Sequence, residues 1–152
     1  MTATNHALTG AVIAVTIKRP ELAIPLAFVS HFVLDALPHF GVHEDDVLRR
    51  NKSKLFRSVI GIDIVVLVAL LILMPLSMHG VPWWVLELAM LAAVAPDLIW
   101  VFRFIRETRT KQWRPGSWFA RFHQAIQRIE KPWGLAIEGI WALLATVILV
   151  QL

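Results

Sequence analysis

The chain of 152 residues contains no cysteine. Disulfide bonds and thiolate metal sites are therefore excluded, and any metal site must use histidine and carboxylate side chains. Charge is also scarce, because 17% of the residues are Asp, Glu, Lys or Arg, whereas 57% are hydrophobic and the mean hydropathy is +0.64. A water-soluble domain of this length has less apolar and more alternating sequence. The composition indicates a membrane protein.

Long apolar runs occupy most of the chain. The runs 58–78, 81–102 and 133–152 each match the ~20 residues that cross a bilayer core. The run 22–37 is shorter, and the run 7–17 is shorter still, so that it either crosses a locally thinned bilayer or dips in and returns. We predict an all-α fold, a polytopic membrane helix bundle of four or five transmembrane helices. Residues 1–152 would form a single integral membrane domain.

The basic residues predict the orientation of this bundle. All 15 Lys and Arg residues lie at 18–19, 49–57 and 103–131, with none in the turn at 79–82 or after residue 131. The two richer stretches flank the third and fourth predicted spans, so they share one side, which the positive-inside rule makes cytoplasmic. The pI near 10.1 is then a consequence of topology, and no nucleic-acid partner is expected.

The segment GSWFARFHQAIQRIE, residues 116–130, is typical of one interfacial amphipathic helix. Ser117 is placed to cap its N-terminus. Such a helix lies along the inner membrane surface, with His123 at the border of its apolar face. The apolar stripe consists of Trp118, Phe119, Phe122, Ile126 and Ile129, and the opposite face of Arg121, Gln124 and Arg128.

The segment VSHFVLDALPHFG, residues 29–41, carries His31, Asp35 and His39 at intervals of four residues. On a helix this spacing points the three side chains to one side. A charge at membrane depth costs at least ~2.5 kcal/mol, so ionisable groups inside a span usually have a function. The segment is therefore the first candidate for a functional site.

Other ionisable groups reach the same depth on the predicted topology. Asp63, Asp97 and Glu138 each lie six or seven residues from a basic loop, roughly 9–10 Å below it at the helical rise. His6 opens the first apolar run, and His123 lies on the surface helix above. Crowded carboxylates repel one another unless they bind protons or share a cation. The pattern predicts a metal site at the inner end of the bundle.

Histidine nitrogen and carboxylate oxygen without sulfur suit Zn²⁺ best, with Mn²⁺ or Fe²⁺ as further options, and the number of donors allows one or two ions. Asp63 and Glu138 are candidate catalytic residues, as general base or as groups that orient the ligand histidines. Arg121, Arg128 and the basic run 103–114 are placed to hold a substrate phosphate. The candidate metal ligands are His6, His31, Asp35, His39, Asp97 and His123.

Several of these groups also have structural alternatives. His39 follows Pro38 at a helix end, where a role as a cap or in a loop is as well supported as metal ligation. Asp63 is able to pair with Arg57, and Glu138 with Lys131, while His123 suits an interfacial position without a ligand role.

Three motifs resemble bacterial membrane-bound metal-dependent hydrolases, a family distantly similar to the zinc-dependent phospholipase C and nuclease fold. They are NHALTGAVIA, VSHFVLDALPHFG and AVAPDLIW, from the first 40 residues and the segment around Asp97. The resemblance implies that His6, His31, Asp35 and Asp97 are metal ligands. The chain departs from the family pattern after Asp97, where Leu98 and Ile99 follow, and at Gln127, which stands four residues after His123.

These observations predict a metal-dependent hydrolase in the bacterial cytoplasmic membrane, with its site toward the cytoplasmic side. The expected substrate is an amphiphilic phosphoester, either a phospholipid or a lipid-linked phosphate, and membrane lipids are the expected partners. A small ion-coupled transporter is an alternative, although the carboxylates lie at one side rather than at the midplane. A noncatalytic membrane scaffold is the third hypothesis.

Overall fold

The computed structural model describes residues 1–41, 53–110, 117–127 and 129–152. Within these ranges the protein is all-helical and contains no strand. The helices are α1 (Ala3–Ile17), α2 (Pro20–Asp35), α4 (Lys54–Ser77), α5 (Trp83–Thr110), α6 (Trp118–Ile126) and α7 (Gly134–Gln151).

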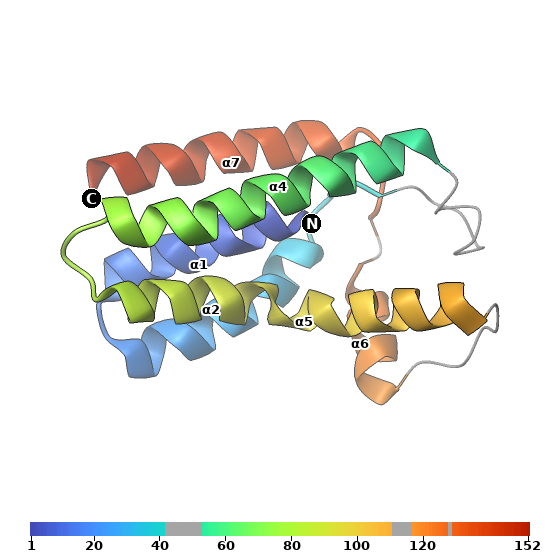
Figure 1. Cartoon of the computed structure of the whole chain (residues 1–152), viewed down its shortest axis with the longest axis horizontal. Coiled ribbons are helices and arrows are strands. Elements are labelled where there is room, and N and C mark those ends of the chain that lie inside the picture. The colour runs from blue at the N-terminus through green and yellow to red at the C-terminus, as the bar shows by residue number, and fades with distance from the viewer. Residues whose placement is uncertain (42–52, 111–116, 128) are drawn as a thin grey trace.

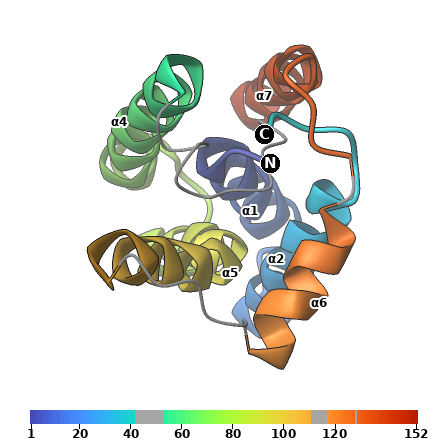
Figure 2. The same ribbon diagram turned by 90° about the vertical axis from the view of Figure 1, so that its right-hand side faces the viewer.

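Helix α1 occupies the centre of the bundle, where it packs against α2, α4, α5 and α7 (Figure 2). The long helices run side by side, while α6 lies across their direction at one end, next to α2 and α5 (Figure 1). The start of α1, the end of α2 and the start of α7 all lie at this end. The end that carries α6 therefore collects segments from the whole chain.

Small residues allow α1 to occupy this central position. Ala7, Ala11 and Ala14 are fully buried. A Cβ atom built on Gly10 would lie 2.5 Å from the carbonyl oxygen of Ala89 in α5, so only glycine permits the observed approach of the two helices. This contact sets the spacing between α1 and α5 one helical turn from His6.

The outer surface of the bundle is apolar. Of the 24 residues of α4, only Phe56, Asp63 and Met74 are buried. Large side chains such as Leu76, which is 74% exposed, and Val150 of α7, which is 82% exposed, point away from the protein. Exposed apolar surface on this scale is characteristic of a protein that meets another apolar phase or partner.

The number of candidate spans is smaller than the sequence predicted. Within the described residues, α4 and α7 are long and apolar enough to cross a membrane, so two candidates stand where four or five were expected. Helices α1 and α2 contain 15 and 16 residues. At the helical rise they extend about 22–24 Å, less than the ~30 Å hydrocarbon core. The apolar part of α5 is interrupted by Glu87 and Asp97.

The predicted amphipathic helix is present as α6 over a shorter range, Trp118–Ile126 rather than 116–130, and its cap is confirmed. The hydroxyl oxygen of Ser117 accepts a hydrogen bond from the backbone N–H of Ala120 at 3.2 Å. The rings of Phe119 and Phe122 contact the ring of Phe32 in α2. These aromatic contacts place α6 against the last turns of α2.

Candidate metal centre

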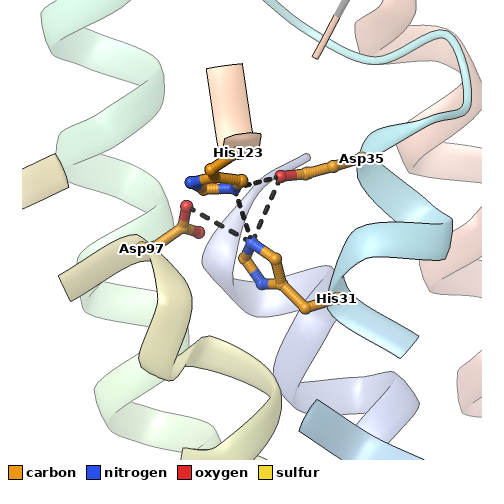
Figure 3. Close-up of side chains that lie close together, drawn as sticks. All are labelled: His31, Asp35, Asp97 and His123. Carbon is orange, nitrogen blue, oxygen red and sulfur yellow. Dashed lines mark hydrogen bonds and ion pairs between the residues drawn. The ribbon is translucent and has the colours of Figure 1, made fainter. Parts of the chain in front are cut away.

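Four of the six predicted metal ligands come together at the end of the bundle that carries α6. His31 and Asp35 lie one turn apart in α2, Asp97 lies in α5 and His123 lies in α6. One potential ligand atom from each residue lies within 4.8 Å of the others, and Figure 3 shows the four side chains pointing toward one another. The described structure therefore contains a cluster that is able to hold a metal ion.

The individual distances show that the cluster is tight. The Nε2 atoms of His31 and His123 are 2.9 Å apart. Oδ2 of Asp35 lies 2.8 Å from Nε2 of His123 and 3.2 Å from Nε2 of His31. Oδ1 of Asp97 lies 3.8 Å from Nε2 of His31. Asp97 is the partly exposed member, with 22% of its side-chain surface accessible, whereas the other three are buried.

A backbone hydrogen bond orients the ring of His31. Its Nδ1–H donates to the carbonyl oxygen of Ala93 in α5 at 2.7 Å. With the proton on Nδ1, the lone pair of Nε2 faces the cluster, which is the arrangement typical of a metal-ligating histidine. Ala93 lies one turn before Pro96 in α5. A proline has no backbone N–H, so the helical hydrogen bonds are weakened in this part of α5.

Asp35 is the centre of the polar network. Besides the two histidines, its Oδ2 accepts a hydrogen bond from the side-chain amide of Gln127 at 2.8 Å. Its Oδ1 accepts from the amino group of Met1 and lies 3.2 Å from Nε2 of His6. A fully buried carboxylate needs partners of this kind, because burial of an unpaired charge is costly.

His6 stands beside the four-residue cluster as a fifth donor. Its ring stacks on that of His31, with centroids 3.9 Å apart. Its Nε2 lies 4.0 Å from Oδ2 of Asp97. The side chain is fully buried, and its Nδ1 has no hydrogen-bond partner among the described residues.

The two carboxylates divide their oxygens between two sides of the cluster. Asp35 directs Oδ1 to His6 and Oδ2 to His31 and His123. Asp97 directs Oδ2 toward His6 and Oδ1 toward His31. Carboxylates arranged in this way are suited to bridge two cations.

The two predicted catalytic carboxylates bind backbone groups around the start of α1. Asp63 accepts hydrogen bonds from the N–H groups of Ala3 and Thr4, each at 2.9 Å. Glu138 accepts from the N–H of Thr2 at 3.0 Å and from the N–H of Phe40 at 2.8 Å. Both carboxylates thus hold the first turn of α1, one turn before His6.

His39 lies at the same end but outside the cluster. Its Nδ1–H donates to the carbonyl of Leu37 at 2.7 Å, and its Nε2 lies 4.0 Å from Oε1 of Glu130. Its backbone forms an isolated parallel bridge with Glu130, which ties the end of α2 to the start of α7. Arg121 is exposed on α6. Arg128, the other predicted phosphate-binding residue, lies outside the described residues.

Sequence reasoning missed the part that Gln127 plays. The residue was noted only as a departure from a family pattern, whereas its amide contacts both Asp35 and Nε2 of His123, the latter at 3.4 Å. Its position one helical turn after His123 was the available signal.

The donor set fits a divalent cation. Two imidazole nitrogens that face each other at 2.9 Å need a shared proton or a shared cation, and two carboxylates supply the balancing negative charge. No protein-family model matches the chain, and neither the curated proteins nor the solved structures compared with it contain a match. The resemblance to membrane-bound metal-dependent hydrolases stays a prediction based on the three motifs.

Proposed function

We propose that the protein is a membrane-embedded, metal-dependent hydrolase of amphiphilic phosphoesters. The observation that supports this most is the convergence of His31, Asp35, Asp97 and His123 at one end of a bundle with an apolar exterior. Two nitrogen and two oxygen donors suit Zn²⁺, with Mn²⁺ and Fe²⁺ as alternatives. In such a site a divalent cation supplies Lewis-acid polarisation of a phosphoryl oxygen and activates water near neutral pH.

The residues of the chain have distinct parts in this proposal. His31 is oriented by the carbonyl of Ala93 in α5 without any contribution from α6, and Gln127 donates to Asp35 when α6 is in place. The second donor set, made by His6 with Oδ1 of Asp35 and Oδ2 of Asp97, would take a second cation in place of the amino group of Met1, which bonds Oδ1 of Asp35 in this structure. The partly exposed edge at Asp97 is the side from which a phosphoester would reach the site.

The position of the site favours a lipid-like substrate at the cytoplasmic face of a bacterial inner membrane. The start of α4, whose first turn contains Lys54 and Arg57, points toward the same end of the bundle as α6 (Figure 1), and Arg121 of α6 is exposed. Basic side chains at this end of the bundle would hold the phosphate of a headgroup, while the apolar exterior would accommodate its acyl chains.

The test is hydrolysis by the purified full chain in liposomes of phosphatidylglycerol and phosphatidylethanolamine. Mass spectrometry would detect release of a phosphorylated or dephosphorylated headgroup before chelation, after chelation and after Zn²⁺ or Mn²⁺ is restored. We expect turnover that chelation abolishes and a cation restores, and no turnover by His31→Ala. The matched control is His79→Ala, an exposed histidine in the turn between α4 and α5.

Two outcomes would contradict the proposal. A protein that binds the cation but releases no product from these lipids or from lipid-linked phosphates would be a metal-stabilised scaffold. Cation-coupled uptake into proteoliposomes without hydrolysis would assign the cluster to a transporter.

A further inference from the structure

Helix α6 has few apolar contacts that hold it to the bundle. Of its nine residues, His123 alone is buried. Phe119 and Phe122 contact Phe32 with centroid separations of 6.0 and 5.6 Å, but Phe122 keeps 47% of its surface exposed. An isolated helix shorter than ~12–15 residues is marginal in water. The polar contacts of α6 must therefore supply much of its attachment.

The described polar contacts of α6 converge on the cluster, where His123 at Nε2 lies 2.9 Å from Nε2 of His31 and also meets Asp35. His123 at Nε2 and Gln127 at Nε2 each lie 2.8 Å from Oδ2 of Asp35. The other cluster residues, His31 and Asp97, are carried by α2 and α5, which pack along the bundle with α1. Three of the four candidate ligands are thus fixed by the bundle, and the fourth is delivered by α6.

We propose that a cation bound by His31, Asp35, Asp97 and His123 latches α6 onto the bundle, so that α6 is a metal-dependent cover of the site. The inference rests on the cation of the proposed function. A cation that joins all four donors ties α6 to α2 and α5. Because binding free energies are reciprocal, a cation that stabilises the docked position of α6 by some factor binds the docked form more tightly by that same factor, so a change that undocks α6 lowers the cation affinity.

The outer face of α6 indicates what the cover meets. Trp118 is 72% exposed, and Arg121 and Gln124 are also exposed. An aromatic and basic face of this kind is suited to an anionic lipid surface. The helix that contacts the lipid surface would therefore also complete the donor set. Contact of α6 with the membrane would in this way be coupled to cation binding at the site.

Hydrogen–deuterium exchange of residues 118–126 tests the latch in the full chain held in lipid nanodiscs, first chelated and then saturated with Zn²⁺. We expect the cation to slow exchange in α6 by a factor within the 5- to 150-fold range typical of coupled sites, with α7 unchanged. In His123→Ala the three remaining ligands bind more weakly, and saturation no longer slows exchange in α6.

The reciprocal measurement uses a residue that has no metal-binding atom. Phe119→Ala weakens the contact of α6 with Phe32, so we expect a lower Zn²⁺ affinity by calorimetry, whereas the exposed control Gln124→Ala binds as the wild type does. The Zn²⁺ affinity of Phe119→Ala and the exchange measured in the wild type test the latch even if His123→Ala does not fold.

The possible failures separate the two proposals. Cation binding with unchanged exchange in α6, or an unchanged affinity in Phe119→Ala, would overturn the latch and leave the proposed hydrolase intact. A wild-type protein that binds no cation would overturn both.

Discussion

Asp35 and His123 are separated by 88 positions in the chain, yet Oδ2 of Asp35 and Nε2 of His123 lie 2.8 Å apart. This contact joins the last residue of α2 to the middle of α6. A helix that lies across the end of the bundle is needed to close the distance, and the Phe32 contacts place it there. The cluster therefore depends on the tertiary arrangement as well as on the spacing within α2.

Replacement of His31 or Asp35 by alanine is expected to remove the bound cation. Both side chains are fully buried, and either substitution removes a ligand atom that contacts the other members of the cluster. Elemental analysis of detergent-purified protein, with the affinity tag at the C-terminus, measures the effect. The control is His39→Ala, because His39 is a buried histidine at the same end but bonds Leu37 and faces Glu130. Full metal content in both cluster variants would rule the site out.

Much of this arrangement could be predicted from the sequence. The apolar runs located the long helices, and Ser117 marked the start of α6. The four-residue spacing of His31 and Asp35 predicted a shared face, and the depth argument added Asp97 and His123. These inferences succeeded because the periodicity of a helix, and the presence of an ionisable residue inside an apolar run, can both be read from neighbouring residues.

The rest required tertiary contacts that no local pattern reports. The central position of α1 depends on the Gly10 contact with Ala89. The backbone groups that Asp63 binds lie 59 and 60 positions away in the chain. Those that Glu138 binds lie 98 and 136 positions away. Two candidate spans stand among the described residues where four or five were predicted, because α1 and α2 are short and the apolar part of α5 contains Glu87 and Asp97.

His6→Ala is expected to remove one of two bound cations while the other remains. The variant takes away the nitrogen that faces Oδ1 of Asp35 and Oδ2 of Asp97, but it leaves His31 and His123 in place. Titration with Mn²⁺, followed by electron paramagnetic resonance, distinguishes a coupled pair of ions from an isolated one. A wild-type protein that binds a single isolated Mn²⁺, and a variant that does the same, would limit the site to one ion.

Asp63→Asn is expected to lower the free energy of unfolding, whereas the cation occupancy of the folded protein changes little. The carboxylate accepts two backbone hydrogen bonds at the first turn of α1, and the loss of a charged acceptor of this kind costs about 1.5–3 kcal/mol. Thermal unfolding in detergent and turnover in liposomes are measured together, so that a general-base role is tested as well. A loss of turnover with an unchanged melting temperature would assign Asp63 to catalysis.

Gly10→Ala is expected to weaken both folding and cation binding. The new Cβ would lie 2.5 Å from the carbonyl oxygen of Ala89, so α1 must move away from α5, at a cost of about 1–3 kcal/mol. His6 lies one turn from Gly10 on the same helical face, so the displacement also draws it away from Asp97 in α5. Gly139→Ala is the matched control, because a Cβ there meets nothing within 4 Å and removal of a helical glycine stabilises by about 0.5–1 kcal/mol. Thermal unfolding and Mn²⁺ affinity are measured for both variants. If Gly10→Ala matched Gly139→Ala in both measurements, the α1–α5 contact would not set the geometry of the site.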